Sequence, residues 1–380
     1  MFLLEHDAKE LLAAEGFAVP AGTLIRDVRF ADAALPPGPW MVKAQIAAGG
    51  RGKAGLIRSA RNTEELRAAL HAILGATHQG VAVRACRIEQ QVAGAAETYL
   101  SFLLDPVTAG VRVIVAAQGG VEIEALAAIP GAIRSASAAP DPVALAAQAD
   151  ALTRGYPAHT ARALSGAGRE LAQIFLAAEL ALLEVNPLFV RPDGSWIAGD
   201  TKIVTDDNAL YRQSAQRALL ESRREAYPAA YLKLRHGCDY VVVDPEGEIG
   251  LLTTGAGLSM MLIDELRAAG FRPYNFLDVR TGGLRGDPAR LVNVLEWIAE
   301  GRRVRVLLVN IFAGITDLGE FARLLCEALA RVPRLRVPIV ARMAGTGVEA
   351  ARAYLAGSNI PVVTDLDAAL EHVRRHLGAS

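Results

Sequence analysis

The spacing of apolar and polar positions changes along the chain near residue 236. Before that point, short strand-like runs follow one another with only turns between them, which is typical of antiparallel neighbours in an α+β domain. After it, short β-branched runs alternate with helical patterns, which predicts a doubly wound parallel sheet. We therefore expect an α/β protein with two domains, at residues 1–235 and 236–380.

The first half has one well-marked helix among its expected strands. Residues 62–74 predict this helix, because Asn62 and Glu65 have the spacing of a capping box and an apolar stripe follows. Residues 126–178 are Ala-rich and mostly helical in pattern, and residues 208–235 are expected to form a polar helical connector. The expected strands are residues 40–45, 56–59, 87–92, 98–105 and 111–116, with a hairpin at 181–204.

The second half predicts strands and helices in strict alternation. The expected strands are residues 240–243, 250–254, 304–312, 337–341 and 361–363. The expected helices are residues 258–269, 288–300, 317–331, 348–356 and 366–377.

Charge and composition narrow the possible partners. Forty Lys and Arg residues against 41 Asp and Glu residues leave a formal charge of -1, so no long-range positive field would attract nucleic acid or an anionic membrane. The apolar run at 306–315 is far shorter than the ~20 residues of a membrane span. Acidic residues in the first ten positions argue against a signal peptide, and three scattered cysteines predict neither a disulfide framework nor a zinc cluster. We expect a cytoplasmic protein.

A glycine-rich loop at residues 47–55 is the first candidate binding element. It follows the expected strand that carries Lys43. Gly50 and Gly52 let backbone N–H groups approach an anion, and Lys43 and Arg51 supply positive charge. A second strand is expected directly afterwards. The pattern therefore predicts a flap over a triphosphate, with a flexible basic hairpin that binds no ligand as the alternative.

Two better-known phosphate motifs do not fit this loop. Ala54 follows Lys53 where a P-loop has Ser or Thr, and Ala47 stands in place of the leading glycine. Gly50, Gly52 and Gly55 match G-x-G-x-x-G, but a strand rather than a helix follows them. This context argues against a nicotinamide dinucleotide fingerprint.

The hairpin at residues 183–202 is the second candidate element. A three-residue turn at 192–194 pairs Asn186 with Asp200 and Glu184 with Lys202, with all four side chains on one side of the ribbon. An amide oxygen and a carboxylate on opposed residues, whose Cβ atoms are about 4.5–5.5 Å apart, can share one magnesium ion. An exposed polar face with a Glu184–Lys202 salt bridge is an equal alternative, and a two-residue turn would put Asn186 and Asp200 on opposite faces.

Three loops in the second half follow expected strands, at residues 253–257, 278–283 and 310–317. In a doubly wound sheet, ligands bind beyond the carboxyl ends of the strands and at helix N-termini. Each loop alone is ordinary turn chemistry, and the three together predict an anion pocket. All seven histidines lie outside these loops, as do the cysteines. A phosphorylated side chain in the reaction would therefore belong to another polypeptide.

These motifs resemble the β subunit of ADP-forming carboxylate–CoA ligases, the succinyl-CoA synthetase and malate–CoA ligase group. The resemblance runs nearly end to end. The segments that carry it are residues 5–11, 42–45, 48–55, 119–124, 184–187, 207–210, 255–258, 275–279 and 308–312. It implies an ATP-grasp domain followed by a flavodoxin-like doubly wound domain.

The resemblance also implies roles for individual residues. The residues implied to bind ATP or GTP are Lys43, Gly50, Arg51, Gly52, Glu89, Val92 and Glu97. Asn186 and Asp200 would bind Mg²⁺, Arg51 would stabilise the transferring phosphoryl group, and Glu184 would face a phosphohistidine on a partner α subunit that also binds most of CoA. The residues implied to line the carboxylic acid and phosphate side are Thr254, Gly314, Ile315 and Thr316.

Several positions depart from the succinate-type pattern. Thr254 stands where these ligases usually have Asn, Arg280 and Thr281 replace two glycines, and Ala313 replaces a glycine in a way associated with malate-type enzymes. The acid, the choice of ATP or GTP, and an αβ or α2β2 assembly are therefore open. The alternatives are a stand-alone ATP-grasp ligase that joins a carboxylate to an amine, and a non-catalytic nucleotide-binding regulator.

Overall fold

The computed structural model describes residues 1–29, 34–121, 126, 128–280, 286–314 and 316–378. It divides into two compact units, Met1–Gln213 and Ser214–Ser380. This division precedes the expected boundary after residue 235, because α7 (Pro228–His236) packs against β13 (Asp239–Val242). The segment expected to be a connector is thus part of the second unit, where it forms α6 (Ser214–Ser222) and α7.

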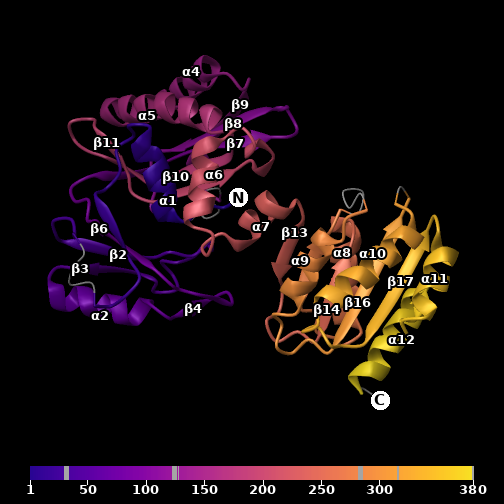
Figure 1. Cartoon of the computed structure of the whole chain (residues 1–380). Coiled ribbons are helices and arrows are strands. Elements are labelled where there is room, and N and C mark those ends of the chain that lie inside the picture. Colours follow the sequence, from indigo (N-terminus) through magenta and orange to yellow (C-terminus); the bar gives the residue numbers. More distant parts are fainter. Residues whose placement is uncertain (30–33, 122–125, 127, 281–285, 315, 379–380) are drawn as a thin grey trace. The chain divides into compact units, whose positions relative to one another are not determined.

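The first unit begins with a four-stranded antiparallel sheet in the order β1-β6-β2-β3 (Figure 1). Its strands are β1 (Gly22–Ile25), β6 (Cys86–Gln90), β2 (Trp40–Ala44) and β3 (Ile57–Ala60). Helix α2 (Thr63–Ile73) packs on β2 and β3 and buries Leu66 and Leu70. Its N-cap is as predicted, since the Asn62 side chain accepts a hydrogen bond from the Glu65 N–H. The glycine-rich loop joins β2 to β3, which confirms the strand–loop–strand order.

A second antiparallel sheet has the order β11-β10-β7-β8-β9, and β12 also pairs with β10. Its strands are β7 (Ala96–Asp105), β8 (Gly110–Ala116), β9 (Ile133–Ala138), β10 (Leu180–Val190), β11 (Trp196–Ala198) and β12 (Thr201–Thr205). The helices that pack on it are α1 (Glu5–Ala14), α4 (Pro142–Leu152) and α5 (Ala158–Ala177). The segment 126–178 was expected to be mostly helical, and β9 corrects this: its small side chains give a weak period, and pairing with β8 makes it a strand.

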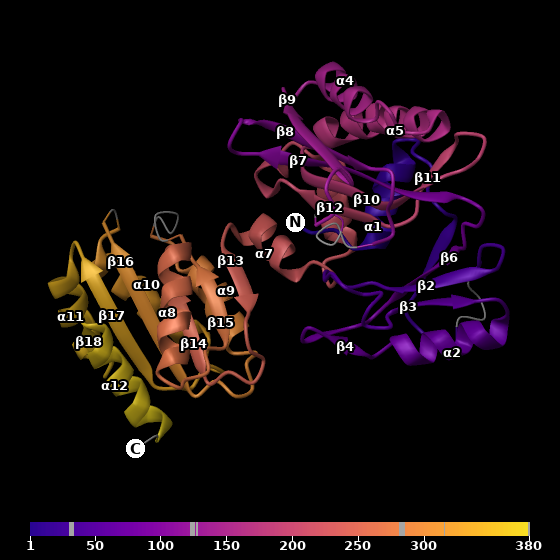
Figure 2. The same ribbon diagram turned by 180° about the vertical axis from the view of Figure 1, so that it is seen from behind.

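The second unit contains a parallel sheet in the order β14-β16-β17-β18. Its strands are β14 (Ile249–Thr253), β16 (Val306–Ala313), β17 (Ile339–Gly345) and β18 (Val362–Val363). Helices cover both faces of this sheet, as expected (Figures 1 and 2). One apolar core contains α8 (Ala256–Ala268) and α12 (Leu366–Leu377). The opposite core contains α9 (Ala289–Ile298), α10 (Leu318–Arg331) and α11 (Val348–Ala356).

One further strand, β15 (Asn275–Asp278), was not predicted. It pairs antiparallel with β13, so the strand expected at residues 240–243 is not part of the parallel sheet as predicted but of a separate two-stranded sheet. The Asn275 side chain bonds both the Leu251 N–H and its carbonyl, which ties β15 to β14. Among the described helices, none has both the length and the apolar character to cross a membrane.

Candidate functional site

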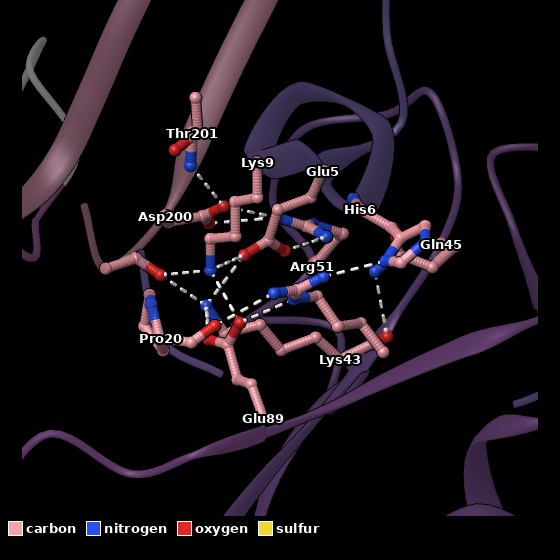
Figure 3. A network of polar contacts seen from close by, with 12 residues as sticks. Glu5, His6, Lys9, Pro20, Lys43, Gln45, Arg51, Glu89, Asp200 and Thr201 are labelled. Carbon is pink, nitrogen blue, oxygen red and sulfur yellow. Dashed lines mark hydrogen bonds and ion pairs between the residues drawn. The ribbon is translucent and has the colours of Figure 1, made fainter. Parts of the chain in front are cut away.

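A cluster of ionisable side chains lies where α1 meets the glycine-rich loop and the turn before β12 (Figure 3). We call it the charge network. Its members are Glu5 and Lys9 of α1, Lys43 of β2, Arg51 of the loop, Arg87 and Glu89 of β6, and Asp200. Four of them were predicted nucleotide or metal ligands, namely Lys43, Arg51, Glu89 and Asp200. The fold brings these four together from segments far apart in the sequence.

Lys43 is buried at the centre of this network and 6% exposed. Its Nζ lies 2.8 Å from Glu5 Oε1 and 2.7 Å from Glu89 Oε1, and donates to the Gly199 carbonyl oxygen at 2.7 Å. Burial acts to lower the pKa of Lys43, but the attraction of Glu5 and Glu89 outweighs it, so the pKa is raised. Lys43 therefore carries its positive charge throughout the neutral range.

Arg51 links the glycine-rich loop to two carboxylates. Its Nη1 lies 2.7 Å from Glu5 Oε2, and its Nη2 lies 2.8 and 2.9 Å from the two oxygens of Asp200. Nη1 also donates to the Ala44 carbonyl at 2.9 Å. Burial and the nearby Glu5 carboxylate raise the pKa of Asp200, against the lowering effect of Arg51. One candidate phosphate ligand thus neutralises one candidate metal ligand.

The loop has the backbone conformation that its glycines allow. Gly50 and Gly55 have φ of 72° and 69°, in the left-handed region, and the turn closes through hydrogen bonds from Ala54 N to Gly50 O (3.1 Å) and from Leu56 N to Arg51 O (3.0 Å). A side chain at Gly50 or Gly52 would meet nothing within 4 Å. There is therefore open space beside the loop.

The predicted register of the β10–β12 hairpin is confirmed. Glu184 pairs with Lys202, and the Asn186 N–H donates to the Asp200 carbonyl at 3.0 Å. The alternative prediction, a salt bridge between Glu184 and Lys202, does not match the contacts of these side chains. Glu184 Oε2 accepts from Tyr99 Oη at 3.2 Å, and Lys202 Nζ lies 5.7 Å from the centre of the Phe2 ring.

The Asn186 and Asp200 side chains have separate partners, although their backbones are paired. Asn186 Oδ1 accepts from the Gly120 N–H at 2.8 Å, and its Nδ2 donates to the Val121 carbonyl at 2.9 Å. Asp200 is held by Arg51 and by the Thr201 N–H. Both nevertheless offer hard oxygen atoms of the kind that magnesium prefers. Within the described residues there is no cluster of three or more His, Cys, Asp or Glu side chains that could hold a metal ion.

The Gly119–Gly120 turn connects Asn186 to another predicted ligand, Glu97. A Cβ at Gly120 would lie 1.7 Å from Glu97 Oε2, and one at Gly119 would lie 2.1 Å from the Thr98 carbonyl oxygen. Backbone leaves no room for a side chain at Gly119, and at Gly120, where φ is 73°, a Cβ would displace the Glu97 carboxylate. Glu97 is near the start of β7 and Glu89 near the end of β6, so these residues and Val92 lie along the segment that links the two sheets.

In the second unit, Thr254 follows β14, and Gly314 and Thr316 follow β16. The two strands are parallel neighbours, with Thr253 paired to Asn310, so the loops leave the sheet side by side as predicted. Ile315 and Thr281 lie outside the described residues.

Asp278, at the start of the loop expected at residues 278–283, contacts the loop that follows β14. Asp278 Oδ1 accepts from the Gly255 N–H at 2.8 Å, so one N–H expected to face an anion has a protein partner here. Arg280, one of the departures from the succinate-type pattern, pairs with Asp239 at 2.9 Å. Asp317 caps α10 by accepting from the Glu320 N–H.

Sequence reasoning missed Glu5, Lys9 and Arg87 as members of the site. All three are at most 4% exposed. Lys, Arg and Glu are almost never fully buried unless paired, so their residue types gave no sign of burial. The one available signal was that Glu5 and Lys9 lie four residues apart inside a segment shared with the resembled family.

Comparison with known proteins agrees with both halves of the chain. A model of the ATP-grasp domain matches residues 2–190, and a CoA-ligase model matches residues 252–375. The succinate–CoA ligase [ADP-forming] subunit β of Chloroflexus aurantiacus is 38% identical over 372 residues, covering 96% of each chain. The chain belongs to the ADP-forming succinate–CoA ligase β-subunit family. Membership confirms the resemblance, the ATP-grasp first part and the acid–thiol ligase class.

Other relatives agree with this family. The corresponding β subunit of Stenotrophomonas maltophilia is 35% identical over 372 residues and 94% of each chain. A structure of ATP citrate lyase from Methanothrix soehngenii with citrate and coenzyme A has a TM-score of 0.75 at 18% identity and covers 99% of both chains, so the fold is shared along the whole length. As members of a β-subunit family, such chains have an α subunit as partner.

Proposed function

We propose that this chain is the nucleotide-binding subunit of an ADP-forming carboxylate–CoA ligase that acts in the cytoplasm with an α-type partner, as an αβ or α2β2 assembly. The observation that carries the proposal is the convergence of Lys43, Arg51 and Asp200 beside a glycine-rich loop with open space. Two cations next to a candidate metal ligand are the groups that bind the phosphates of a nucleoside triphosphate and its metal ion.

The nucleotide, ATP or GTP, would lie between the glycine-rich loop and the segment that links the two sheets. Gly50 and Gly52 would offer backbone N–H groups to phosphate oxygens, and Lys43 and Arg51 would stabilise charge on the transferring phosphoryl group. Glu89, Val92 and Glu97 would contact the rest of the nucleotide. Lys43 and Arg51 pair with carboxylates in the structure, so nucleotide phosphates would replace part of these ion pairs.

The donor set suits magnesium. Asn186 and Asp200 would hold the ion through one amide oxygen and one carboxylate, with water and phosphate oxygens completing the shell. The bound ion would neutralise charge on the phosphate oxygens. For Asp200 to act as a ligand, Arg51 must move its guanidinium from Asp200 to the phosphates. We therefore propose that metal–nucleotide binding and rearrangement of the Arg51–Asp200 pair occur together.

Three transfers complete the proposed reaction. The terminal phosphoryl group of the nucleotide passes to an imidazole nitrogen of the partner's histidine, and ADP leaves. An oxygen of the carboxylic acid then attacks this phosphorus, and an acyl phosphate forms as the imidazole leaves. The CoA thiol attacks the acyl carbon and releases phosphate. Glu184 would face the phosphohistidine, and Thr254, Gly314, Ile315 and Thr316 would line the acid and phosphate side.

Succinate is the first candidate substrate, with malate or another dicarboxylic acid next because of Thr254 and Arg280. The test is co-expression with the α-type chain and a CoA-ligation screen over succinate, malate, itaconate and citrate. ADP and acyl-CoA formed together with one acid, and only when both chains are present, support the proposal. Ligation of an acid to an amine by the isolated chain, or failure of every nucleotide to bind, would overturn it.

A further inference from the structure

Lys9 has no role in the chemistry just described, although it is a fully buried ammonium group beside it. Its side chain is 0% exposed. Nζ lies 2.7 Å from Glu5 Oε1, 2.6 Å from Glu89 Oε2 and 2.7 Å from the Gly199 carbonyl oxygen. An ammonium group has three N–H donors, and these three acceptors use all of them. Burial lowers the pKa of Lys9, against the attraction of Glu5 and Glu89. With its three donors used, Lys9 has none left for a phosphate.

Lys43 uses the same three acceptor groups. It contacts Glu5 through the same oxygen as Lys9, Glu89 through the other carboxylate oxygen, and Gly199 through the same carbonyl. Figure 3 shows both ammonium groups between the Glu5 and Glu89 carboxylates. Each acceptor is thus satisfied twice. If Lys43 turned away toward a ligand, Lys9 would still pair with Glu5, Glu89 and Gly199.

This duplication matters because buried charges are costly when unpaired. Without Lys9, movement of Lys43 to a phosphate would leave Arg87 as the cation paired with the buried Glu89 carboxylate. The Gly199 carbonyl would then accept from neither lysine. The network would then hold Lys43 more tightly. The four cations of the network contact four carboxylates, because Arg87 also lies 3.4 Å from Glu10, so loss of Lys9 would leave one negative charge of this cluster uncompensated.

We propose that Lys9 is a positioning residue of the nucleotide site, which keeps Glu5, Glu89 and Gly199 paired so that Lys43 can turn from them to a nucleotide phosphate. This inference rests on the proposed function. Gly199 immediately precedes Asp200, so the same contact also fixes the turn that presents the candidate metal ligand.

The test is the affinity of the full-length chain for Mg-ADP, measured by isothermal titration calorimetry. Lys9→Met removes the charge and keeps most of the side-chain volume, and it should raise the Kd at least about tenfold. With the partner subunit present, the KM for ATP should rise in parallel, while the KM for the carboxylic acid stays within about twofold of the wild-type value.

A second variant separates this role from general damage to the fold. Lys9→Met combined with Glu5→Gln removes one charge of each sign, so cations and carboxylates stay in balance and one carboxylate fewer needs a partner. Its Kd should return to within about threefold of the wild-type value. Leu171→Ala, which creates a cavity in α5 outside the network, is the matched destabilised control and should leave the Kd unchanged.

The possible outcomes separate the two proposals. Failure of the wild-type chain to bind Mg-ADP would defeat the proposed function itself. Normal binding by the wild type and an unchanged Kd in Lys9→Met would overturn only the role of Lys9, and so would a double variant that binds as weakly as Lys9→Met. If Lys9→Met does not fold, the double variant is compared with the wild type directly: a Kd within about threefold of the wild-type value agrees with the inference, and a Kd raised about tenfold would overturn it.

Discussion

Asp200→Asn tests the role of the candidate metal ligand with little disturbance of the fold. The substitution keeps the shape of the side chain and removes its charge. Asp200 is 28% exposed and paired with Arg51, while Arg51 retains Glu5 at 2.7 Å and the Ala44 carbonyl at 2.9 Å. The cost to stability should lie between that of an exposed and a buried ion pair, at about 1–2 kcal/mol. In a domain of this size such a change lowers Tm by roughly 2–8 °C.

The effect on catalysis should be far larger. Loss of one preorganised electrostatic group typically reduces kcat about 10²–10³-fold. The assay is ADP release by the complex with its α-type partner, alongside thermal unfolding of the same preparation. Asp244→Asn is the matched control, because Asp244 is 26% exposed and pairs with Arg272 at 2.9 Å in the second unit. It should lose comparable stability and keep its turnover. Unaltered turnover in Asp200→Asn would refute the assignment of Asp200.

Two further predictions concern the Gly119–Gly120 turn and the response to acid. Gly120→Ala should reduce nucleotide affinity, measured by calorimetry, at least about tenfold, because its Cβ would overlap the Glu97 carboxylate. Gly131→Ala is the control, since Gly131 has a similar positive φ and no neighbour within 4 Å, and it should leave the affinity unchanged. Equal effects of the two substitutions would contradict this prediction. Burial acts to raise the pKa values of Glu5 and Glu89, but the cations of the charge network outweigh it and lower both. Their stabilisation is therefore complete above the ordinary value of 4.5 and disappears as pH falls through the lowered pKa values. The free energy of unfolding, measured in urea, should differ between wild type and Glu5→Gln by a constant amount from pH 7 to 5, and this difference should shrink below about pH 4.5. A difference that already shrinks between pH 7 and 5 would contradict the prediction.

Local patterns predicted the elements that present the site. The capping box at Asn62 and Glu65 begins α2, and the turn chemistry at residues 192–194 sets the pairing of Asn186 with Asp200. Both depend on residues close together in the sequence, where turn and cap geometry leave few choices. The alternation of strands and helices in the second half also predicted the parallel sheet, because β14, β16 and β17 bury side chains on both faces.

The contacts inside the site could not be predicted in the same way. Lys9 reaches Gly199 and Arg51 reaches Asp200 across long stretches of sequence, and only the tertiary fold determines these ion pairs. Two of the strands that were not predicted, β9 and β15, were missed for a similar reason. The strand β9 is stabilised by its neighbour β8, and β15 is tied to β14 by an asparagine side chain. Neither feature gives a period in the local sequence.

The proposed function requires the first unit to transfer a phosphoryl group from Mg²⁺-bound ATP or GTP to a histidine of the partner chain. The most direct measurement is incubation of the co-purified complex with γ-labelled ATP in the absence of acid and CoA, followed by separation of the two chains. We expect acid-labile label on a histidine of the α-type chain, and labelling about 10²–10³-fold slower when Asp200→Asn replaces the wild type. Label that stays in free ATP with the wild-type complex, or that appears on this chain instead, would contradict it.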